Sequence, residues 1–305
     1  MGLNGLLDAA PILMLIALGV VIRKIGMLDQ RGGLALTRLA FNVTIPAAIF
    51  VSIARADFEP TLLWMPVLGF VVPILLAGLM YLTTRRLADR PRQRGPLLVG
   101  MVVLGVFAFP FMELFFGPGG LARIALYDVG NAFYSGIVAV TLARHFGRDG
   151  GDGSAISWRR VLTSPILVAA IAGVVFTVAE LPLTGPFASF CDRLAVANTP
   201  LAMIAVGVFL RPQRAYGALV AQFVLIRMVI GGLLGWGLGL LLGLDGLSLI
   251  AGTVGSSLPA GTTVLVLSGN EGLDAELAAS LVSVSILVGA VVVNVLPHIL
   301  AAIYL

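Results

Sequence analysis

The polar side chains that could perform chemistry are few, and they lie inside long apolar stretches of the chain. Asp128, Asn131 and Ser135 follow one another at i, i+3 and i+7, so a helix would present all three on one face. A carboxylate at the centre of a membrane helix costs about 2.5–3.5 kcal/mol on insertion scales, which makes Asp128 a functional candidate. Because protonation would neutralise it, Asp128 is predicted to be an ion-coupling residue. The alternative is a shallow position near the outer surface, in which Asp128 pairs with Arg123 or caps local structure.

A second candidate is the small, polar patch around Pro259, in the stretch IAGTVGSSLPAGTTVLVLSG. A proline inside an apolar helix removes a backbone hydrogen bond and frees carbonyl groups. A half-helix that begins just after Pro259 would direct its partly positive N-terminal amides into the protein, where they suit a carboxylate or another anion. The alternative is a proline kink packed by small residues. The patch and its counterpart proline are predicted to bind the substrate through Pro110, Ser256, Ser257, Pro259, Gly261, Thr262 and Thr263.

Four further polar residues complete the predicted substrate site: Asn131, Arg227, Asn42 and Asn198. Arg227 is the one basic residue placed inside an apolar stretch. It could bind a substrate carboxylate with two hydrogen bonds, pair with Asp128 or Glu113, or extend toward the membrane surface. The two asparagines before prolines could line a cavity or form hydrogen bonds between helices.

Metal, cofactor and enzyme chemistry find little support in the sequence. Two distant histidines and the lone Cys191 do not make a metal site, and one cysteine allows no disulfide within the chain. Tyr127-Asp128 matches only the first half of the motif of intramembrane aspartyl proteases. The predictions are therefore no metal, no cofactor and no enzymatic activity. Gly231 and Gly235 are expected to allow close helix packing.

Membrane helices must position these residues, because the composition excludes a soluble protein. Of the 305 residues, 59% are hydrophobic and only 11% are charged, with a mean hydropathy of +1.06. Loops are brief except for 144–160, whose Gly-Asp-Ser composition is that of a flexible linker. Apolar stretches long enough to cross a membrane are predicted at 6–22, 34–53, 61–82, 96–116, 122–143, 162–180, 194–210, 216–242, 247–267 and 277–304.

The distribution of basic residues predicts how these stretches are oriented in the membrane. If the first stretch runs from outside to inside, all 19 basic residues except Arg55, Arg123, Arg193 and Arg227 fall in or beside the inner loops. The positive-inside rule favours this arrangement. It predicts an integral, multi-pass protein of a bacterial inner membrane with both termini outside. The net charge of +4 then reflects topology and indicates no nucleic-acid partner.

Two halves of the chain are predicted to be inverted repeats. PILMLIALGVVI from Pro11 and PILVAAIAGVVF from Pro165 are identical at six of twelve positions, at an offset of 154. Pro46 and Pro200 share that offset, and Pro110 and Pro259 are 149 apart. The predicted fold is an all-α polytopic membrane protein with ten transmembrane helices in two inverted five-helix repeats, with broken crossover helices 4 and 9. The predicted domains are 1–150 and 161–305, joined by a cytoplasmic linker at 151–160.

Four segments of the sequence carry a resemblance to a known family: GVVIRKIGMLDQRGGLALTRLAFNVTIPAAIF, ALYDVGNAFYSG, NTPLAMIAVGVFL, and GSSLPAGTTVLVLSGNEG through AELAASLVSVS. In this order they resemble the auxin efflux carrier family of transporters. The resemblance implies helices 4 and 9 that cross at prolines, a substrate near that crossing, and a mobile half that rocks against a scaffold. It also implies a fold shared with bile acid sodium symporters. Its bacterial members carry small organic anions such as malonate or malate, and its plant members export auxin.

One departure from the family concerns the segment before Pro110. The family pattern is N-x-G-x-x-G-x-P, and this sequence has Val103, Gly105 and Ala108 at the first three defined positions. The asparagine is absent, so polar chemistry in the first crossover is reduced to backbone groups. This departure leaves room for a more hydrophobic or aromatic substrate.

The predicted function is a secondary transporter that moves a small organic anion, either malonate-like or an aromatic acid, by alternating access with proton coupling. The alternatives are a sodium-coupled symporter and a channel-like facilitator, and an intramembrane enzyme is a remote third. The predicted partners are the organic anion, a coupling proton or sodium ion, the lipid bilayer and a second copy of the chain in a homodimer.

Overall fold

The described part of the protein is built from helices. The computed structural model describes residues 10–55, 60–87, 90–147, 163–210 and 216–305, and within them no β-strand occurs. The all-α membrane class is therefore confirmed. The α-helices are α2 (Ala10–Lys24), α3 (Gln30–Leu39), α4 (Ile45–Ala54), α5 (Trp64–Thr83), α6 (Pro91–Val99), α7 (Gly105–Phe133), α8 (Val140–Phe146), α10 (Pro165–Val178), α11 (Gly185–Phe209), α12 (Gly217–Val224), α13 (Gly231–Leu241), α14 (Gly246–Ser256), α15 (Thr263–Glu271) and α16 (Ala275–Tyr304).

Short π-helical segments join several of these helices into longer rods. The π-helix η1 (Ala40–Thr44) links α3 to α4, η4 (Tyr134–Ala139) links α7 to α8, and η5 (Leu225–Ile230) links α12 to α13. Two 3-10 segments, η2 (Pro60–Leu63) and η3 (Arg85–Leu87), flank α5. By length and composition, six helical runs of the described chain could cross a membrane: Gly32–Ala54, Thr61–Thr83, Gly105–Phe146, Gly185–Phe209, Gly217–Leu241 and Ala275–Tyr304.

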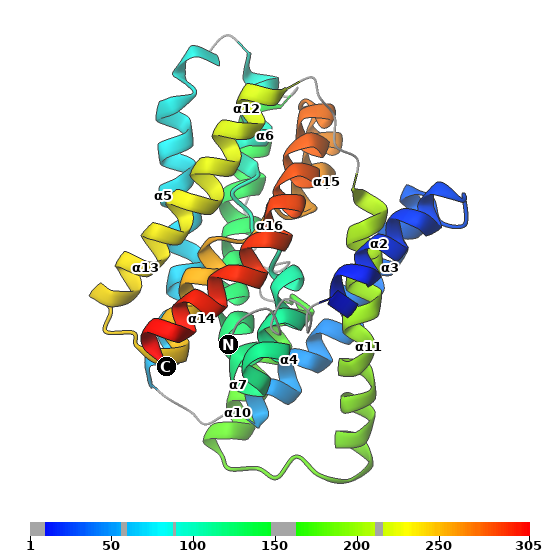
Figure 1. The fold of residues 1–305 in the computed structure, drawn as a ribbon, viewed down its shortest axis with the longest axis vertical. Helices are drawn as coiled ribbons and strands as arrows, with labels where there is room; N and C mark the ends of the chain where they lie inside the picture. Colours follow the sequence, from blue (N-terminus) through cyan, green and yellow to red (C-terminus); the bar gives the residue numbers. More distant parts are fainter. Residues whose placement is uncertain (1–9, 56–59, 88–89, 148–162, 211–215) are drawn as a thin grey trace.

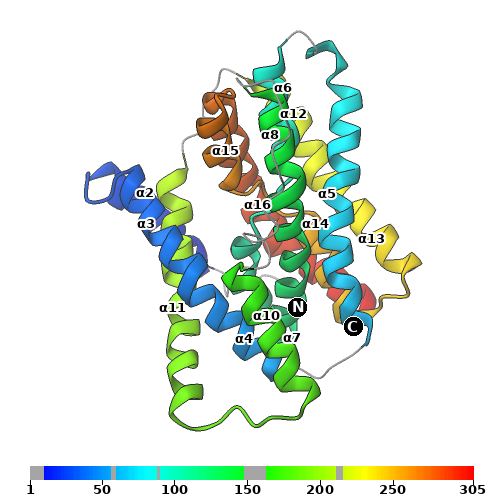
Figure 2. The same ribbon diagram turned by 180° about the vertical axis from the view of Figure 1, so that it is seen from behind.

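The helices pack into two groups. In the first group α2, α3, α4, α10 and α11 contact one another, and in the second α5 to α8 pack with α12 to α16. Figures 1 and 2 show the first group at one side and the lower end of the molecule, and the second group at the opposite side and the upper end. The main contacts between the groups are made by α7, against α4, α10 and α11. Each half of the sequence therefore contributes helices to both groups.

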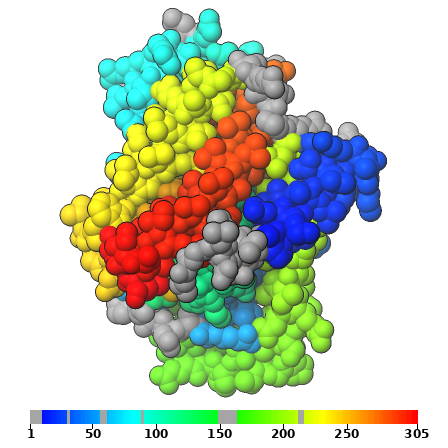
Figure 3. All heavy atoms as spheres, in the orientation of Figure 1, coloured from blue at the N-terminus to red at the C-terminus, as the bar shows by residue number. Residues whose placement is uncertain are grey.

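The outer face of the second group is apolar. Figure 3 shows α12, α13 and α16 side by side on that face. Large aliphatic side chains point outward from it, with Leu233 at 61%, Val291 at 63% and Ile303 at 66% exposure. A water-soluble protein rarely keeps so many on one face, whereas lipid chains solvate them at no cost.

Glycines bring the backbones of α5 and α7 into direct contact. A Cβ atom on Gly130 would overlap the carbonyl oxygen of Pro66, and one on Gly69 would overlap the carbonyl oxygen of Tyr127. Small residues of this kind let membrane helices approach closely and gain van der Waals contact. The contact fixes the height of α7 against α5, and α7 carries Asp128.

The same device holds other helix pairs together. In the first group, Gly207 on α11 faces the backbone of α2 at Ile16, where a Cβ would overlap the carbonyl oxygen. In the second, Gly231 and Gly235 of α13 lie against Ser256 of α14, with no room for a side chain. The prediction that this glycine pair serves helix packing is confirmed. In each group, glycines therefore let the backbones of neighbouring helices pack closely against each other.

Two apolar stretches contain a break, as predicted, but the first break is not at its proline. α6 ends at Val99 and α7 begins at Gly105, while α14 ends at Ser256 and α15 begins at Thr263. Pro110 lies inside α7, and the break precedes it by more than a turn. The reason is that a proline disturbs the helical turn on its N-terminal side, so a break related to Pro110 lies upstream of it.

We predict that substituting Gly130 with alanine destabilises the protein, because the new methyl group must push α7 away from Pro66. Overpacking of this kind costs about 1–3 kcal/mol. Gly78 is the matched control, since it lies on the same helix pair and a Cβ there meets nothing within 4 Å. Thermal unfolding in detergent should show a lower Tm for Gly130→Ala and an unchanged or higher Tm for Gly78→Ala. Equal Tm values for the two variants would contradict the close packing.

Candidate functional site

The two unwound segments, 100–104 and 257–262, cross each other inside the protein and are joined by backbone hydrogen bonds. Leu104 N donates to Pro259 O at 2.9 Å, and Gly261 N donates to Val102 O at 2.8 Å. Between these bonds, Val103 and Ala260 form an isolated antiparallel bridge. Non-helical backbone is tolerated within a membrane only where protein groups or a cavity satisfy it. Each segment therefore supplies hydrogen-bond partners to the other.

Side chains hold the centre of each segment from the other side. Asn131 Oδ1 accepts from Val103 N at 2.8 Å, and its Nδ2 donates to Val103 O at 3.1 Å. Ser285 Oγ accepts from Ala260 N at 3.1 Å. Asn131 was among the predicted residues, whereas Ser285 was not. The repeat offset of 154 relates these two positions and is the signal that could have identified Ser285.

The carbonyl ends of the two half-helices before the breaks are also bonded to side chains. Tyr134 Oη donates to Leu98 O of α6 at 3.1 Å, and Arg227 Nη1 donates to Ser256 O of α14 at 3.0 Å. The last carbonyls of a helix lack partners within it, so such donors stabilise the ends. Both donors come from π-helices, η4 and η5.

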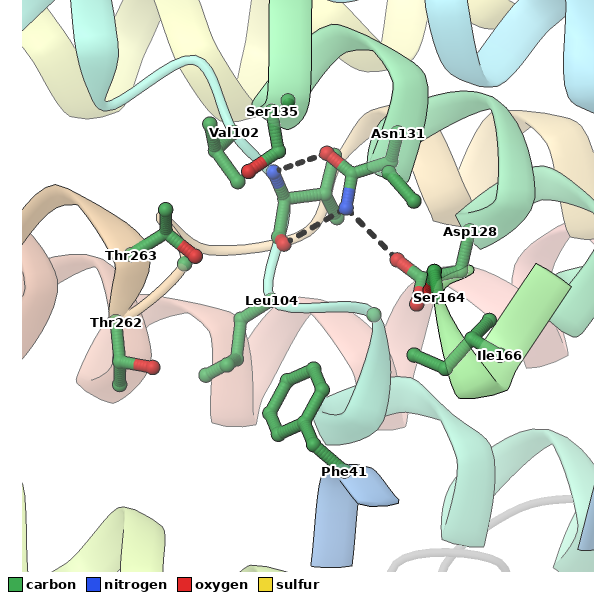
Figure 4. Close-up of a pocket in the computed structure, with 15 residues that line it drawn as sticks. Phe41, Val102, Leu104, Asp128, Asn131, Ser135, Ser164, Ile166, Thr262 and Thr263 are labelled. Carbon is green, nitrogen blue, oxygen red and sulfur yellow. Dashed lines mark hydrogen bonds between the residues drawn. The ribbon is translucent and has the colours of Figure 1, made fainter. Parts of the chain in front are cut away.

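A cavity of about 220 Å³ lies beside this crossing. Figure 4 shows it between the unwound segments, the α7 residues Asp128 and Asn131, and the first helix group, which contributes Phe41, Ser164 and Ile166. The cavity thus lies at the boundary between the two helix groups. Its lining residues are Phe41, Val102, Val103, Leu104, Gly105, Asp128, Asn131, Ala132, Ser135, Gly136, Ser164, Ile166, Gly261, Thr262 and Thr263.

Asp128 lies in the later part of α7, after the non-helical Gly117, and it lines the cavity beside Gly105, where α7 begins. Its side chain is buried, with 4% exposure, and its Oδ1 accepts from Asn131 Nδ2 at 2.8 Å. The carboxylate rests on Gly105, where a Cβ would overlap it. It therefore occupies the partly positive N-terminal end of the half-helix, which favours a negative charge. Arg123 does not pair with it: in the described structure, Arg123 donates to Ser248 Oγ at 2.9 Å and to Gly119 O at 3.2 Å.

The other half-helix after a break, α15, also begins at the cavity. Gly261, Thr262 and Thr263 line the wall there, and α15 runs from Thr263 away from the cavity. The amides of Val264 and Leu265 donate to Gly261 O at 3.1 Å and to Thr262 O at 3.0 Å, so the amide of Thr263 is the donor that this end presents, together with the partial positive charge of a helix N-terminus. Figure 4 shows Thr262 and Thr263 across the cavity from Asp128. Three of the residues predicted from the Pro259 patch therefore meet Asp128 and Asn131 around one space.

The other residues of the Pro259 patch lie away from the cavity. Ser256 Oγ donates to Gly252 O at 2.8 Å and lies 3.2 Å from Tyr127 Oη. Ser257 lines a groove on the apolar outer face, and the ring of Pro259 packs against Gly289 of α16. Pro110 is buried within α7 and is not a lining residue. These positions shape the crossing without lining the space beside it.

The two asparagines before prolines do not line the cavity either. Asn42 is exposed, and its Nδ2 donates to Arg38 O at 2.7 Å. Asn198 is buried, and its Oδ1 accepts from Thr44 Oγ1 at 3.3 Å, which joins α11 to η1. Phe41, the neighbour of Asn42, faces the cavity instead. The π-helical turn η1 contains an extra residue and so rotates the face that a regular helix would present.

Arg227 pairs with neither Asp128 nor Glu113, although either pairing was considered from the sequence. It is fully buried, it does not line the cavity, and its Nε and Nη2 have no hydrogen-bond partner in the described structure. Its one bond is to the end of α14. No group of three or more His, Cys, Asp or Glu side chains that could hold a metal ion occurs among the described residues.

Comparisons with known proteins show similarity to membrane transport proteins. The family model described as "Membrane transport protein" matches residues 153–297. The chain is 30% identical over 283 residues to an uncharacterized transporter of Methanothermobacter thermautotrophicus, covering 90% of this chain and 91% of that protein. It is 24% identical over 283 residues to an uncharacterized transporter of Methanocaldococcus jannaschii, covering 88% of this chain and 90% of that protein.

We predict that Asn131→Asp destabilises the crossing. The substitution removes the amide that donates to Val103 O and Asp128, and it places a second carboxylate beside Asp128. Leaving buried groups unpaired costs about 1–3 kcal/mol each, so thermal unfolding at neutral pH should show a clear loss of Tm. Asn42→Asp is the matched control, because Asn42 is exposed and bonds only to its own helix. A Tm for Asn131→Asp as high as that of the control would contradict a stabilising role for the two hydrogen bonds between Asn131 and Val103.

Proposed function

The chain belongs to the auxin efflux carrier family of membrane transport proteins, and on this premise we propose that it is a secondary transporter of a small organic anion. The observation that carries the proposal is the cavity at the crossing, where the N-terminal end of α15 meets apolar walls. A carboxylate would accept hydrogen bonds from the amide of Thr263, the first residue of α15, and from the hydroxyls of Thr262 and Thr263. The body of the anion would contact Phe41, Leu104 and Ile166.

Alternating access is supported by the packing of the two helix groups. Each group contains helix pairs in backbone contact, whereas the cavity lies at the boundary between the groups. We assign α2, α3, α4, α10 and α11 to a scaffold and the second group to the moving part. Rocking of one group against the other would expose the site to either side in turn, as in transporters with discontinuous helices.

The contacts at the crossing also support the inverted repeat. In a structure with an approximate two-fold axis, residues on the axis touch their own counterparts. Thr44 and Asn198, which are 154 residues apart, bond to each other. Val103 and Ala260, which are 157 apart, form the bridge. We therefore propose ten membrane spans in two five-helix repeats, 1–150 and 161–305, with a linker at 151–160 that lies within the undescribed segment 148–162.

The axis contacts revise the alignment of the two breaks. An offset of 157 brings the bridging residues Val103 and Ala260 into register, whereas the sequence matched Pro110 to Pro259 at 149. Pro110 has no role at the crossing in this alignment. The orientation with both termini outside, in a bacterial inner membrane, remains our proposal from the arginine distribution.

Asp128 is the residue we propose for proton coupling. It is a buried carboxylate in the cavity wall, and its charge would oppose that of a bound anion. Protonation in one half of the cycle would remove this repulsion. Sodium coupling and a channel-like pathway are the competing mechanisms, and they differ in ion dependence and in counterflow.

We predict that purified protein in proteoliposomes catalyses counterflow of organic anions, tested with malonate, malate and phenylacetate as probes. A pH gradient should drive uptake of the dicarboxylates malonate and malate, and a sodium gradient should not. Thr263→Val removes a hydroxyl from the anion end and should raise KM on the order of tenfold, the equivalent of about 1.4 kcal/mol. Thr141→Val is the control, because Thr141 is exposed on α8 and bonds only to its own helix.

Three outcomes would contradict the proposal. Currents far above carrier turnover without counterflow would indicate a channel, and sodium-driven uptake would assign the coupling to sodium. An unchanged KM for Thr263→Val, with transport intact, would place the anion elsewhere.

A further inference from the structure

The two half-helix ends that meet the cavity are not equivalent in charge. α7 begins at Gly105 on one side, and α15 begins at Thr263 on the other. Both ends carry the partial positive charge of a helix N-terminus. At α7 that charge is already matched by Asp128, whose carboxylate touches Gly105. The end of α15 has no matching carboxylate from the corresponding position. That position, 154 residues after Asp128, is Val282 of α16, which is apolar and fully buried.

The Asp128 carboxylate is only partly satisfied within the protein. Its Oδ1 accepts from Asn131 Nδ2, whereas Oδ2 accepts no hydrogen bond from the described residues. Asp128 is 4% exposed, and it is one of the residues that line the cavity. A carboxylate oxygen that lacks a partner within the protein and faces a cavity marks that cavity as a place in which a ligand or a proton meets Asp128.

No other described charge in the cavity wall compensates Asp128. The lining residues contributed by η1, α10, η4, α15 and both unwound segments are apolar, small, amide or hydroxyl residues. Of the described ionisable groups, Tyr127 interacts electrostatically with Asp128, and it is a neutral phenol that bonds to Ser256. Arg227 and Arg123 bond elsewhere. A second negative charge that enters the cavity would therefore meet the ionised Asp128 with no described cation in the lining to offset the repulsion.

We propose that Asp128 is a charge filter that sets how many negative charges the site accepts. This inference rests on the proposed function. While ionised, Asp128 occupies the positive end of α7 and leaves only the end of α15 free, so that the cavity binds a ligand with one carboxylate. A dianion binds only after Asp128 takes up a proton from water, which frees the end of α7 for the second carboxylate. A monoanion therefore moves without a proton, and a dianion moves with one.

The test compares two acids of equal length, butyrate and succinate, with the purified full-length protein at pH 8. Ligand affinity is measured from the concentration dependence of thermal stabilisation. The wild type should prefer butyrate. Asp128→Asn should strengthen succinate binding by at least about tenfold, which is the order expected for removing a like charge at short range. Asp245→Asn is the matched control, because Asp245 precedes α14 and its side chain makes no cap bond there; its preference should equal that of the wild type.

A second measurement does not depend on the variant. Ethanesulfonate and ethane-1,2-disulfonate keep their charges between pH 8 and pH 5, so any change in their relative affinity comes from the protein. For the wild type, the affinity for the disulfonate relative to that for the monosulfonate should rise as the pH falls. For Asp128→Asn, this affinity ratio should not change with pH. A succinate-to-butyrate ratio equal in wild type and Asp128→Asn would overturn the filter, as would a disulfonate ratio independent of pH in the wild type. Failure of all four probes to bind the wild type would overturn the proposed function as well.

Discussion

Backbone groups in the interior of a membrane must find hydrogen-bond partners within the protein, and the structure around the crossing follows from this constraint. Two helices are broken there, and each break exposes amides and carbonyls with no water to bond them. The two segments form hydrogen bonds with each other around the bridge between Val103 and Ala260, while Asn131 and Ser285 bond to their outer sides. Breaks of this kind cost free energy except where other groups replace the lost helical hydrogen bonds. Here they bring the ends of α7 and α15 to a single cavity.

The two halves share this framework but differ in the charges placed on it. The carbonyl end of α6 is bonded by a neutral phenol, Tyr134, and that of α14 by a cation, Arg227. The amide end of α7 has a carboxylate, Asp128, and that of α15 has none. Two similar breaks with different charges can hold an anion at one helix end and a titratable group at the other.

The sequence was sufficient for the class of fold and for the stretches that contain the breaks, because apolar length and the Gly-Ser-Pro patch are local signals. Asp128, Asn131 and the residues after Pro259 were also found, since an i, i+3 stripe and a proline break need no knowledge of packing. The substrate itself remains a proposal.

Other features depend on contacts that no local pattern records. Phe41 rather than Asn42 faces the cavity because a π-turn rotates that face by one residue. Arg227 bonds to Ser256 because glycines let α13 approach α14, and a lone arginine in a sequence does not reveal which carbonyl it will meet. Pro110 was misplaced because a proline indicates that a helix breaks nearby without fixing how far upstream the next helix begins.

The central claim is that an organic anion binds at the amide end of α15 in the cavity beside the crossing. Protection from chemical labelling tests it most directly. Cys191 is the single cysteine, so a Cys191→Ala background that carries Thr262→Cys offers one reactive thiol at the site. The account predicts that an anion which undergoes counterflow slows the reaction of this thiol with a small maleimide, with half-protection at the KM of that anion. Labelling at an unchanged rate in the presence of saturating, transported anion would contradict it.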